Sequence, residues 1–124
     1  MDQKQAVDFC NQWLPAWTGN RPDNLIDFYH QDVFYRDPTA SKGITGRRKL
    51  LVYFKLLLKR NPDWVWTHDE VFETTNGFTL KWKARIPVGN KIVEEFGLDI
   101  VELQDGRIIR NEVFFDLSAL RANN

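Results

Sequence analysis

The chain has 124 residues, which is enough for one domain with a buried core but too few for two, so a single domain over residues 1–124 is expected. Lysine plus arginine equals aspartate plus glutamate at 17 each, so the net charge is zero and no nucleic-acid partner is expected. The lone cysteine, Cys10, excludes an internal disulfide and no apolar run is long enough to span a membrane, so we expect a cytoplasmic protein without a membrane partner.

The first half of the chain shows three helical patterns. Apolar residues recur at helical spacing from Asp2, a suitable N-cap, to about Trp17. A second, short helix is expected to begin at Pro22, because proline fits the first turn of a helix. A third helix, over roughly residues 47–60, has leucines and Phe54 on its buried side. Each helix therefore has an apolar face to pack against a sheet.

A strand is expected over residues 33–37, because the residue before Pro38 is forced into extended geometry. Alternation places Tyr35 and Asp37 on the same face of this strand. Two roles stay open for Asp37. Its carboxylate can act on a ligand, or it can cap the turn that follows, as aspartates at the start of a turn often do.

Residues 64–116 predict four antiparallel strands joined by three hairpins. The Asn-Gly pair at 76–77 is the strongest short hairpin signal, and a two-residue turn there sets Val71 opposite Trp82. The Gly-Asn pair at 89–90 predicts a second two-residue turn. It pairs apolar residues with apolar ones and acidic residues with basic ones across the strands, which supports the register.

The third hairpin decides which polar groups meet. The second turn sets Leu80 opposite Asp99. If the third turn had two residues, Asp99 would face Glu112 and the two carboxylates would repel each other. A three-residue loop over 104–106 avoids this contact and sets Asp99 opposite Asn111. We therefore expect the longer loop.

The expected registers surround Asp99 and Asn111 with apolar side chains on one face, which we name the concave face. A few polar groups in apolar surroundings are typical of a ligand pocket, and burial there should raise the pKa of Asp99. The same pair could instead be a satisfied buried contact that only fixes the strand register. The apolar and aromatic residues expected to line the pocket are Tyr35, Phe54, Trp82, Val101, Val113 and Phe115.

The opposite, convex face carries a second apolar group formed by Phe96, Leu98, Ile100 and Phe114, with Phe96 directly opposite Phe114. Charged residues of both signs surround this group. An exposed apolar patch with a charged rim is typical of an interaction site, and mixed charges suit pairing with a second copy of the same chain. We therefore expect a homodimer through the convex face.

Two parts of the sequence share a family pattern. Residues 29–38 and 44–47 form a helix end, a strand, an Asp-Pro pair, a loop and a Gly-Arg pair, and residues 98–103, 105–108 and 112–116 form the last two strands. Both parts resemble the nuclear transport factor 2-like superfamily, especially its SnoaL-like and ketosteroid isomerase-like branches. The resemblance implies a cone-shaped, cystatin-like α+β fold, in which a strongly curved antiparallel sheet wraps around N-terminal helices and encloses one pocket, often in a homodimer.

The resemblance also implies roles for single residues. Asp37 matches the isomerases' catalytic base, and Asp99 matches the acid that donates a hydrogen bond to the developing enolate. The family's oxyanion tyrosine on the first helix is missing here. Its place falls near Gln12, with Trp13 beside it, and both side chains can donate a hydrogen bond. Gln12 and Trp13 are therefore expected at the pocket.

Three functions stay open. The first is a cofactor-independent isomerase or cyclase that moves a proton on a small hydrophobic, carbonyl-bearing compound, with Asp37 as base and Asp99, aided by Asn111, as donor. The second is a pocket that binds such a ligand without turnover, and the third is a dimerising protein-interaction module. His30 and His68 lack partners at ligand spacing and no Gly-rich phosphate loop occurs, so neither a metal nor a cofactor is expected.

Overall fold

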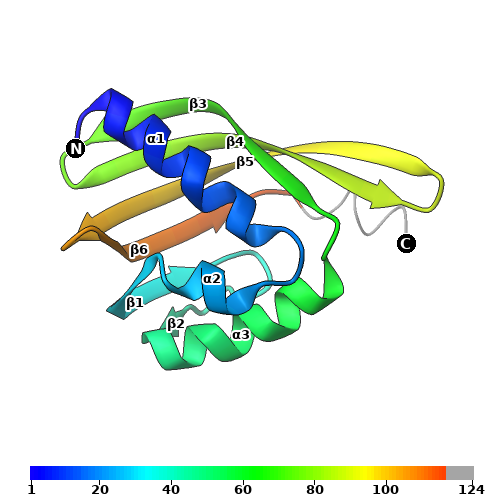
Figure 1. The fold of residues 1–124 in the computed structure, drawn as a ribbon, viewed down its shortest axis with the longest axis horizontal. Coiled ribbons are helices and arrows are strands. Elements are labelled where there is room, and N and C mark those ends of the chain that lie inside the picture. The colour runs from blue at the N-terminus through cyan, green and yellow to red at the C-terminus, as the bar shows by residue number, and fades with distance from the viewer. Residues whose placement is uncertain (117–124) are drawn as a thin grey trace.

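The computed structural model describes residues 1–116 as a curved, unclosed six-stranded sheet with helices along one side (Figure 1). This confirms the predicted α+β fold; residues 117–124 of the predicted domain lie outside the described residues. The helices are α1 (Gln3–Trp13), the 3-10 helix η1 (Leu14–Trp17), α2 (Pro22–Ile26) and α3 (Arg47–Arg60). The strands are β1 (Tyr29–Arg36), β2 (Ile44–Thr45), β3 (Val65–Thr74), β4 (Gly77–Val88), β5 (Lys91–Gln104) and β6 (Arg107–Phe114).

Helix α1 begins where the sequence predicts, because Asp2 caps it. The side chain of Asp2 accepts a hydrogen bond from the backbone of Gln5 (2.8 Å), and the side chain of Gln5 accepts one from the backbone of Asp2 (2.9 Å). The α-helix ends at Trp13, and the chain tightens into η1 around Pro15. The ring of Trp13 lies 6.3 Å from that of Phe78 on β4, so α1 packs on the inner face of the sheet. No helix within residues 1–116 is long and apolar enough to cross a membrane.

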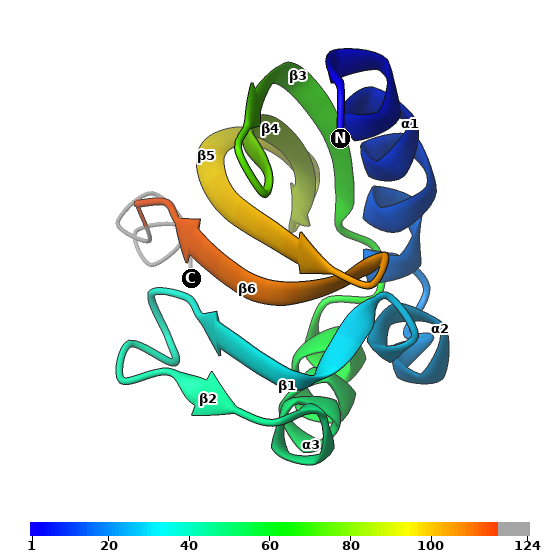
Figure 2. The same ribbon diagram turned by 90° about the vertical axis from the view of Figure 1, so that its left-hand side faces the viewer.

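The strand order is β2-β1-β6-β5-β4-β3, and β1 runs parallel to β6. This corrects the expectation of a wholly antiparallel sheet. Parallel neighbours need a long crossover, which the chain from α3 through β5 supplies. The short β2 lies within the stretch expected to be a loop, residues 39–46, where Thr45 pairs with Phe34. Because Arg36 pairs with Glu112, the ends of β1 and β6 lie side by side (Figure 2).

The hairpin between β4 and β5 has the predicted register. The turn at residues 89–90 sets Leu80 opposite Asp99 and Trp82 opposite Gly97. The ring of Trp82 lies directly over Gly97, where an added Cβ would come within 2.1 Å of a ring carbon. The glycine therefore makes room for the ring, and the ring closes part of the inner face.

The predicted register of the hairpin between β3 and β4 is wrong by two residues. The turn is formed by residues 75–76, so Val71 pairs with Leu80 instead of the expected tryptophan. Gly77 is the first residue of β4 rather than part of the turn. A Cβ at this position would come within 2.1 Å of the carbonyl oxygen of Val101 on β5, so the close approach of the two strands requires glycine. A shift by two residues leaves the side chains of residues 70–74 on their predicted faces, since side chains alternate with a period of two.

The three-residue loop predicted for the last hairpin is also wrong. The turn is formed by residues 105–106, both with positive φ (55° and 78°), as a two-residue hairpin turn requires. The expected repulsion between Asp99 and Glu112 does not arise, because a bulge at Ile109 shifts β6 by one residue. Asp99 therefore pairs with Val113 rather than with the expected asparagine.

The convex face carries the expected apolar group. Phe96, Leu98 and Phe114 are 50%, 45% and 44% exposed, and Ile100 is half-buried. Because β6 is shifted, Leu98 rather than Phe96 lies opposite Phe114, which corrects the predicted pair. The ammonium group of Lys81 lies 5.8 Å from the ring centre of Phe96. The apolar group therefore remains open to solvent with charges at its edge.

Replacing Gly77 with alanine is expected to destabilise the protein by about 1–3 kcal/mol, because the new methyl group would collide with backbone atoms of β5. Thr75→Ala, in the exposed turn of the same hairpin, is the matched control and should change the free energy of unfolding by less than about 0.5 kcal/mol. Urea denaturation of both variants measures the difference. Equal stabilities would contradict the close approach of β4 and β5.

Candidate functional site

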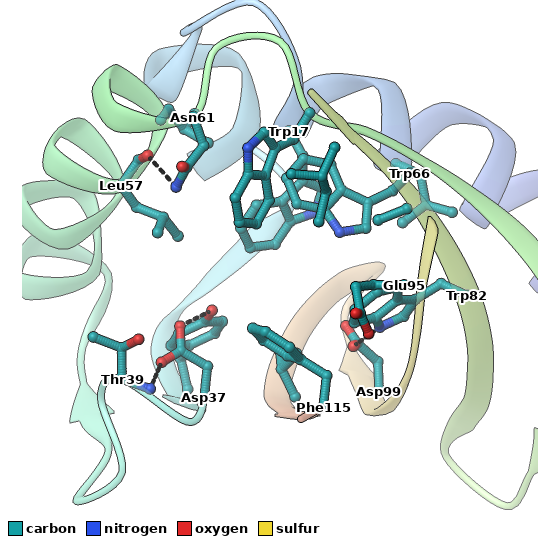
Figure 3. Close-up of a pocket in the computed structure, with 17 residues that line it drawn as sticks. Trp17, Asp37, Thr39, Leu57, Asn61, Trp66, Trp82, Glu95, Asp99 and Phe115 are labelled. Carbon is teal, nitrogen blue, oxygen red and sulfur yellow. Dashed lines mark hydrogen bonds between the residues drawn. The ribbon is translucent and has the colours of Figure 1, made fainter. Parts of the chain in front are cut away.

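A cavity of about 140 Å³ lies between the inner face of the sheet, η1 and the end of α3 (Figure 3). A cavity of about 150 Å³ holds benzene in another protein, so this one has room for one six-membered ring. A more open pocket adjoins it and shares Asp37, Val113 and Phe115. The residues lining the cavity are Leu14, Trp17, Tyr35, Asp37, Thr39, Leu57, Leu58, Asn61, Trp64, Trp66, Trp82, Ala84, Ile86, Glu95, Asp99, Val113 and Phe115.

Asp37 follows β1 and is 7% exposed. Its Oδ2 accepts hydrogen bonds from the phenols of Tyr35 and Tyr53 (2.7 Å each), and its Oδ1 accepts from the backbone N–H groups of Thr39 and Ala40 (2.9 and 2.6 Å). The two backbone bonds are the turn cap considered for this residue. Burial, followed by the contact with Asp37, raises the pKa of both phenols, so they stay protonated as donors. All four acceptor positions of the carboxylate are thus occupied.

Asp99 lies on β5, across the cavity from Asp37, and is 4% exposed (Figure 3). Its Oδ1 accepts a hydrogen bond from the indole of Trp82 (2.7 Å), and its Oδ2 accepts one from the amide of Asn111 (3.0 Å). Burial raises the pKa of Asp99 from 3.8 to about 7, although both hydrogen bonds act in the opposite direction, and the charge of Asp37 adds to the rise. Asp99 can therefore gain or lose a proton near neutral pH.

A line of buried groups extends from Asp99 away from the cavity. Asn111 donates to Asp99 and accepts a hydrogen bond from the phenol of Tyr29 (2.8 Å). Burial, and after it the charge of Asp99, raises the pKa of Tyr29, so this phenol stays a donor. The nearby indole of Trp13 lowers the pKa of Tyr29, although its N–H group makes no hydrogen bond within residues 1–116. The phenol thereby fixes the amide of Asn111 with its nitrogen toward Asp99.

The structure brings only part of the predicted site together. The predicted residues that line the cavity are Tyr35, Asp37, Trp82, Asp99, Val113 and Phe115. Asn111 does not line it but holds Asp99 from behind. Phe54 and Val101 are fully buried and lie in the core, outside the lining. The prediction that Phe54 and Val101 are buried is confirmed, but the prediction that they line the cavity is wrong.

The placement of Gln12 and Trp13 at the cavity is wrong. Gln12 is exposed, and Trp13 is fully buried in the core. Trp13 shares the buried face of α1 with Ala6 and Cys10, so it packs into the core, and Gln12, one position earlier, points to solvent. Leu14 and Trp17 of η1 line the cavity in their place.

Sequence reasoning missed Tyr53 and Trp66 as site residues. Strict alternation from the buried Val71 would place Trp66 on the outer face. An irregularity of register between His68 and Glu70 reverses the alternation and brings Trp66 to the cavity. No local signal in the sequence marks such an irregularity.

The polar groups at the cavity are mainly carboxyl groups. Within residues 1–116, no group of three His, Cys, Asp or Glu side chains is arranged to hold a metal ion. Three carboxyl groups, those of Asp37, Glu95 and Asp99, line a cavity that has room for a small ring. Asp99 has a pKa raised to about 7, and Asp37 is held by four donors. A ligand between Asp37 and Asp99 would therefore meet one carboxyl group that can hold a proton and one carboxylate whose acceptor positions are occupied by the protein.

The sequence matches one family model, which describes a SnoaL-like domain and covers residues 10–111. No curated protein matches the chain.

Several solved structures share the fold. A candidate SnoaL-like polyketide cyclase from Shewanella putrefaciens CN-32 is 16% identical, with a TM-score of 0.77 over 99% of this chain and 86% of that one. A protein with a ketosteroid isomerase-like fold from Catenulispora acidiphila, in complex with trimethylamine, is 17% identical (TM-score 0.76, 91% and 88% covered). An LEH-like epoxide hydrolase from Mycobacterium tuberculosis is 16% identical, with a TM-score of 0.75 over 97% of this chain and 89% of that one. At these identities the likeness shows the fold alone.

The raised pKa of Asp99 predicts that the protein loses stability as the pH rises from about 4 to about 7. In this range the folded state keeps the proton that the unfolded state has released, so folding is favoured on the acid side. One pKa unit corresponds to about 1.4 kcal/mol, so the whole effect is about 4 kcal/mol at most.

Denaturant unfolding at a series of pH values measures this effect, and Asp99→Asn is the comparison that isolates Asp99 from the other carboxyl groups. The difference in stability between wild type and variant should change in favour of the variant as the pH rises. A difference that does not depend on pH would contradict the buried, protonated state of Asp99.

Proposed function

The chain belongs to the SnoaL-like domain family, and on that premise we propose that its cavity binds a small hydrophobic carbonyl compound, which Asp37 and Asp99 isomerise or cyclise without a cofactor. The observation that supports the proposal is that both carboxyl groups line one apolar cavity from opposite sides (Figure 3). Isomerisation of a carbonyl compound needs one group to take a proton and another to supply one on the same ligand. The two aspartates can fill these roles together.

Asp99 acts as the donor in this proposal. With a pKa of about 7 it holds a proton at and below neutral pH, and it can donate that proton to a carbonyl oxygen that becomes an enolate. Trp82 and Asn111 each occupy one acceptor position and fix the orientation of the carboxyl group. Turnover by this route falls as the pH rises above about 7, because the donor loses its proton.

Asp37 acts as the base. Its four donors replace the water that burial removes, which a buried anion requires. To accept a proton from the ligand, one acceptor position must open. Tyr53 is the partner that can leave, because it is half-buried on α3, whereas Tyr35 is fully buried and the other two donors belong to the backbone.

The same four contacts favour a second candidate function, a binding pocket without turnover. A carboxylate whose acceptor positions are all occupied has no free position for a ligand proton. Asp37 would then hold the turn after β1, and Asp99 would serve as a polar anchor for the ligand. The two candidates differ in whether Asp37 exchanges protons with the ligand.

We also propose that this chemistry takes place in the cytoplasm. The single cysteine, Cys10, is a free and buried thiol. Burial, and after it the charge of Asp99, raises its pKa to about 12, so it stays protonated and unreactive. A protein without disulfides fits a reducing compartment.

A homodimer through the convex face is our proposal for the assembly. Leu98 and Phe114 lie opposite each other at the centre of the exposed apolar group. Around them, Lys81 contacts acidic residues of β3, and Arg110 contacts Glu102 and Glu112. Charges of both signs at the rim suit a twofold contact, in which each patch meets its own copy. The interface lies on the face of the sheet away from the cavity, so it leaves the site open.

Catalysis is tested by deuterium exchange next to the carbonyl group of small cyclic ketones, followed by NMR in D₂O. The wild type should accelerate the exchange, and Asp37→Asn should reduce the rate by roughly 100-fold to 10,000-fold, because the base is lost. The variant should still fold, since asparagine can accept from the two backbone groups and donate to the two phenol oxygens.

Asp63→Asn, the same chemical change at an exposed position, is the control and should retain the rate. A wild type that binds a ketone without exchanging its protons would favour the second candidate.

For the dimer, the informative change is Leu98→Asp, which would place an unpaired charge at the centre of the contact and should give monomers at micromolar concentration. Leu56→Asp on α3, at a residue that is 55% exposed, is the matched control and should remain dimeric. Static light scattering measures the mass. A monomeric wild type would refute the dimer, and a dimeric Leu98→Asp variant would refute this surface.

A further inference from the structure

The cavity holds negative charge and no positive charge. Asp37, Glu95 and Asp99 line it, and its lining residues include no lysine, arginine or histidine. Arg36 belongs to the adjoining, more open pocket and is ion-paired with Glu112 at 3.7 Å. An anionic group that enters the cavity would therefore be repelled, and a cationic group would be attracted.

Three residues lie side by side across strands β3, β4 and β5, with alanine in the middle between a tryptophan and a glutamate. Trp66 on β3 pairs with Ala84 on β4, and Ala84 pairs with Glu95 on β5. Neighbouring strands lie about 4.8 Å apart, so the backbones of Trp66 and Glu95 are separated by roughly 10 Å. Because alanine has only a methyl group, the row leaves a recess between the two larger side chains. All three residues line the cavity.

Three indoles meet at this end of the cavity. The ring of Trp66 lies 5.9 Å from that of Trp17 and 5.8 Å from that of Trp64, and all three line the cavity (Figure 3). The face of an indole attracts a cation within about 6 Å of its centre more strongly than any other aromatic side chain does. The recess therefore combines aromatic faces with a carboxylate, which is the composition of sites that recognise organic ammonium groups.

Glu95 is the carboxylate with capacity for a ligand. It is half-buried, and it makes no hydrogen bond or ion pair with another residue in the range 1–116. Asp37 and Asp99, in contrast, are held by hydrogen bonds from the protein. The charge of Glu95 is thus free to serve as the counter-ion of a ligand.

We propose that the ligand carries a positively charged nitrogen, which lies in the recess over Ala84 against the indole of Trp66, with Glu95 as its counter-ion. The inference rests on the proposed function, since it adds a charge to the same small carbonyl compound. Glu95 and Asp99 lie on the same face of β5, four residues apart. Trp82 and Asn111 already hold the carboxyl group of Asp99, so Glu95 rather than Asp99 neutralises the nitrogen.

Three probes that share a six-carbon ring and differ in charge test the inference: cyclohexylammonium, cyclohexanone and cyclohexanecarboxylate. Calorimetry at pH 7 and constant ionic strength should show that the ammonium probe binds at least about tenfold more tightly than the carboxylate probe. Glu95→Gln should weaken the ammonium probe at least about tenfold and leave cyclohexanone within about twofold. Glu94→Gln is the matched control: it removes the same charge from the convex side of β5, opposite Arg85, and should change neither affinity.

The outcomes separate the two proposals. Binding of cyclohexanone without binding of the ammonium probe would overturn the charged ligand and leave the proposed function intact. An ammonium affinity that survives Glu95→Gln would overturn the recess as its site. Failure of all three probes to bind would overturn both the charged ligand and the proposed function.

Discussion

The site depends on one buried carboxyl group, that of Asp99, having both of its oxygens hydrogen-bonded inside an apolar wall. Trp82 reaches it from β4 and Asn111 reaches it from β6, while Tyr29 on β1 fixes the amide of Asn111. Four neighbouring strands must therefore be in register for this contact to form. A buried polar group without partners would cost about 1–3 kcal/mol. The register of the sheet and the chemistry of the cavity are thus governed by the same contacts.

Local signals in the sequence predict most of the fold. Helix α3 has the expected bounds, Arg47–Arg60, and the pairing of β4 with β5 is as expected, because caps, turns and alternation act over a few residues. The two wrong hairpins are each displaced by two residues, so inner and outer faces were assigned correctly except before the irregularity in β3, at residues 65–68. The parallel pairing of β1 with β6 was missed, since no local pattern specifies which distant strand lies alongside.

The sequence predicts those residues of the candidate site whose position follows from the alternation of side chains along a strand. Asp37 and Asp99 both line the cavity, and Trp82 donates a hydrogen bond to Asp99. The failures have separate causes. Trp13 shares the buried face of α1 with Ala6 and Cys10, so it lies in the core. The irregularity in β3 brings Trp66 to the inner face, and spacing along the sequence does not reveal it.

The parallel pairing of β1 with β6 also determines the order in which the protein can be assembled. During synthesis β1 is made before α3 and the three long strands, and among the strands in residues 1–116 the short β2 is its only sheet neighbour until β6 emerges. Pairing between strands so far apart in sequence is slow, and an unpaired edge with apolar side chains such as Val33 and Tyr35 is prone to aggregate. The wall that presents Asp37 is therefore completed only when β6 pairs with β1.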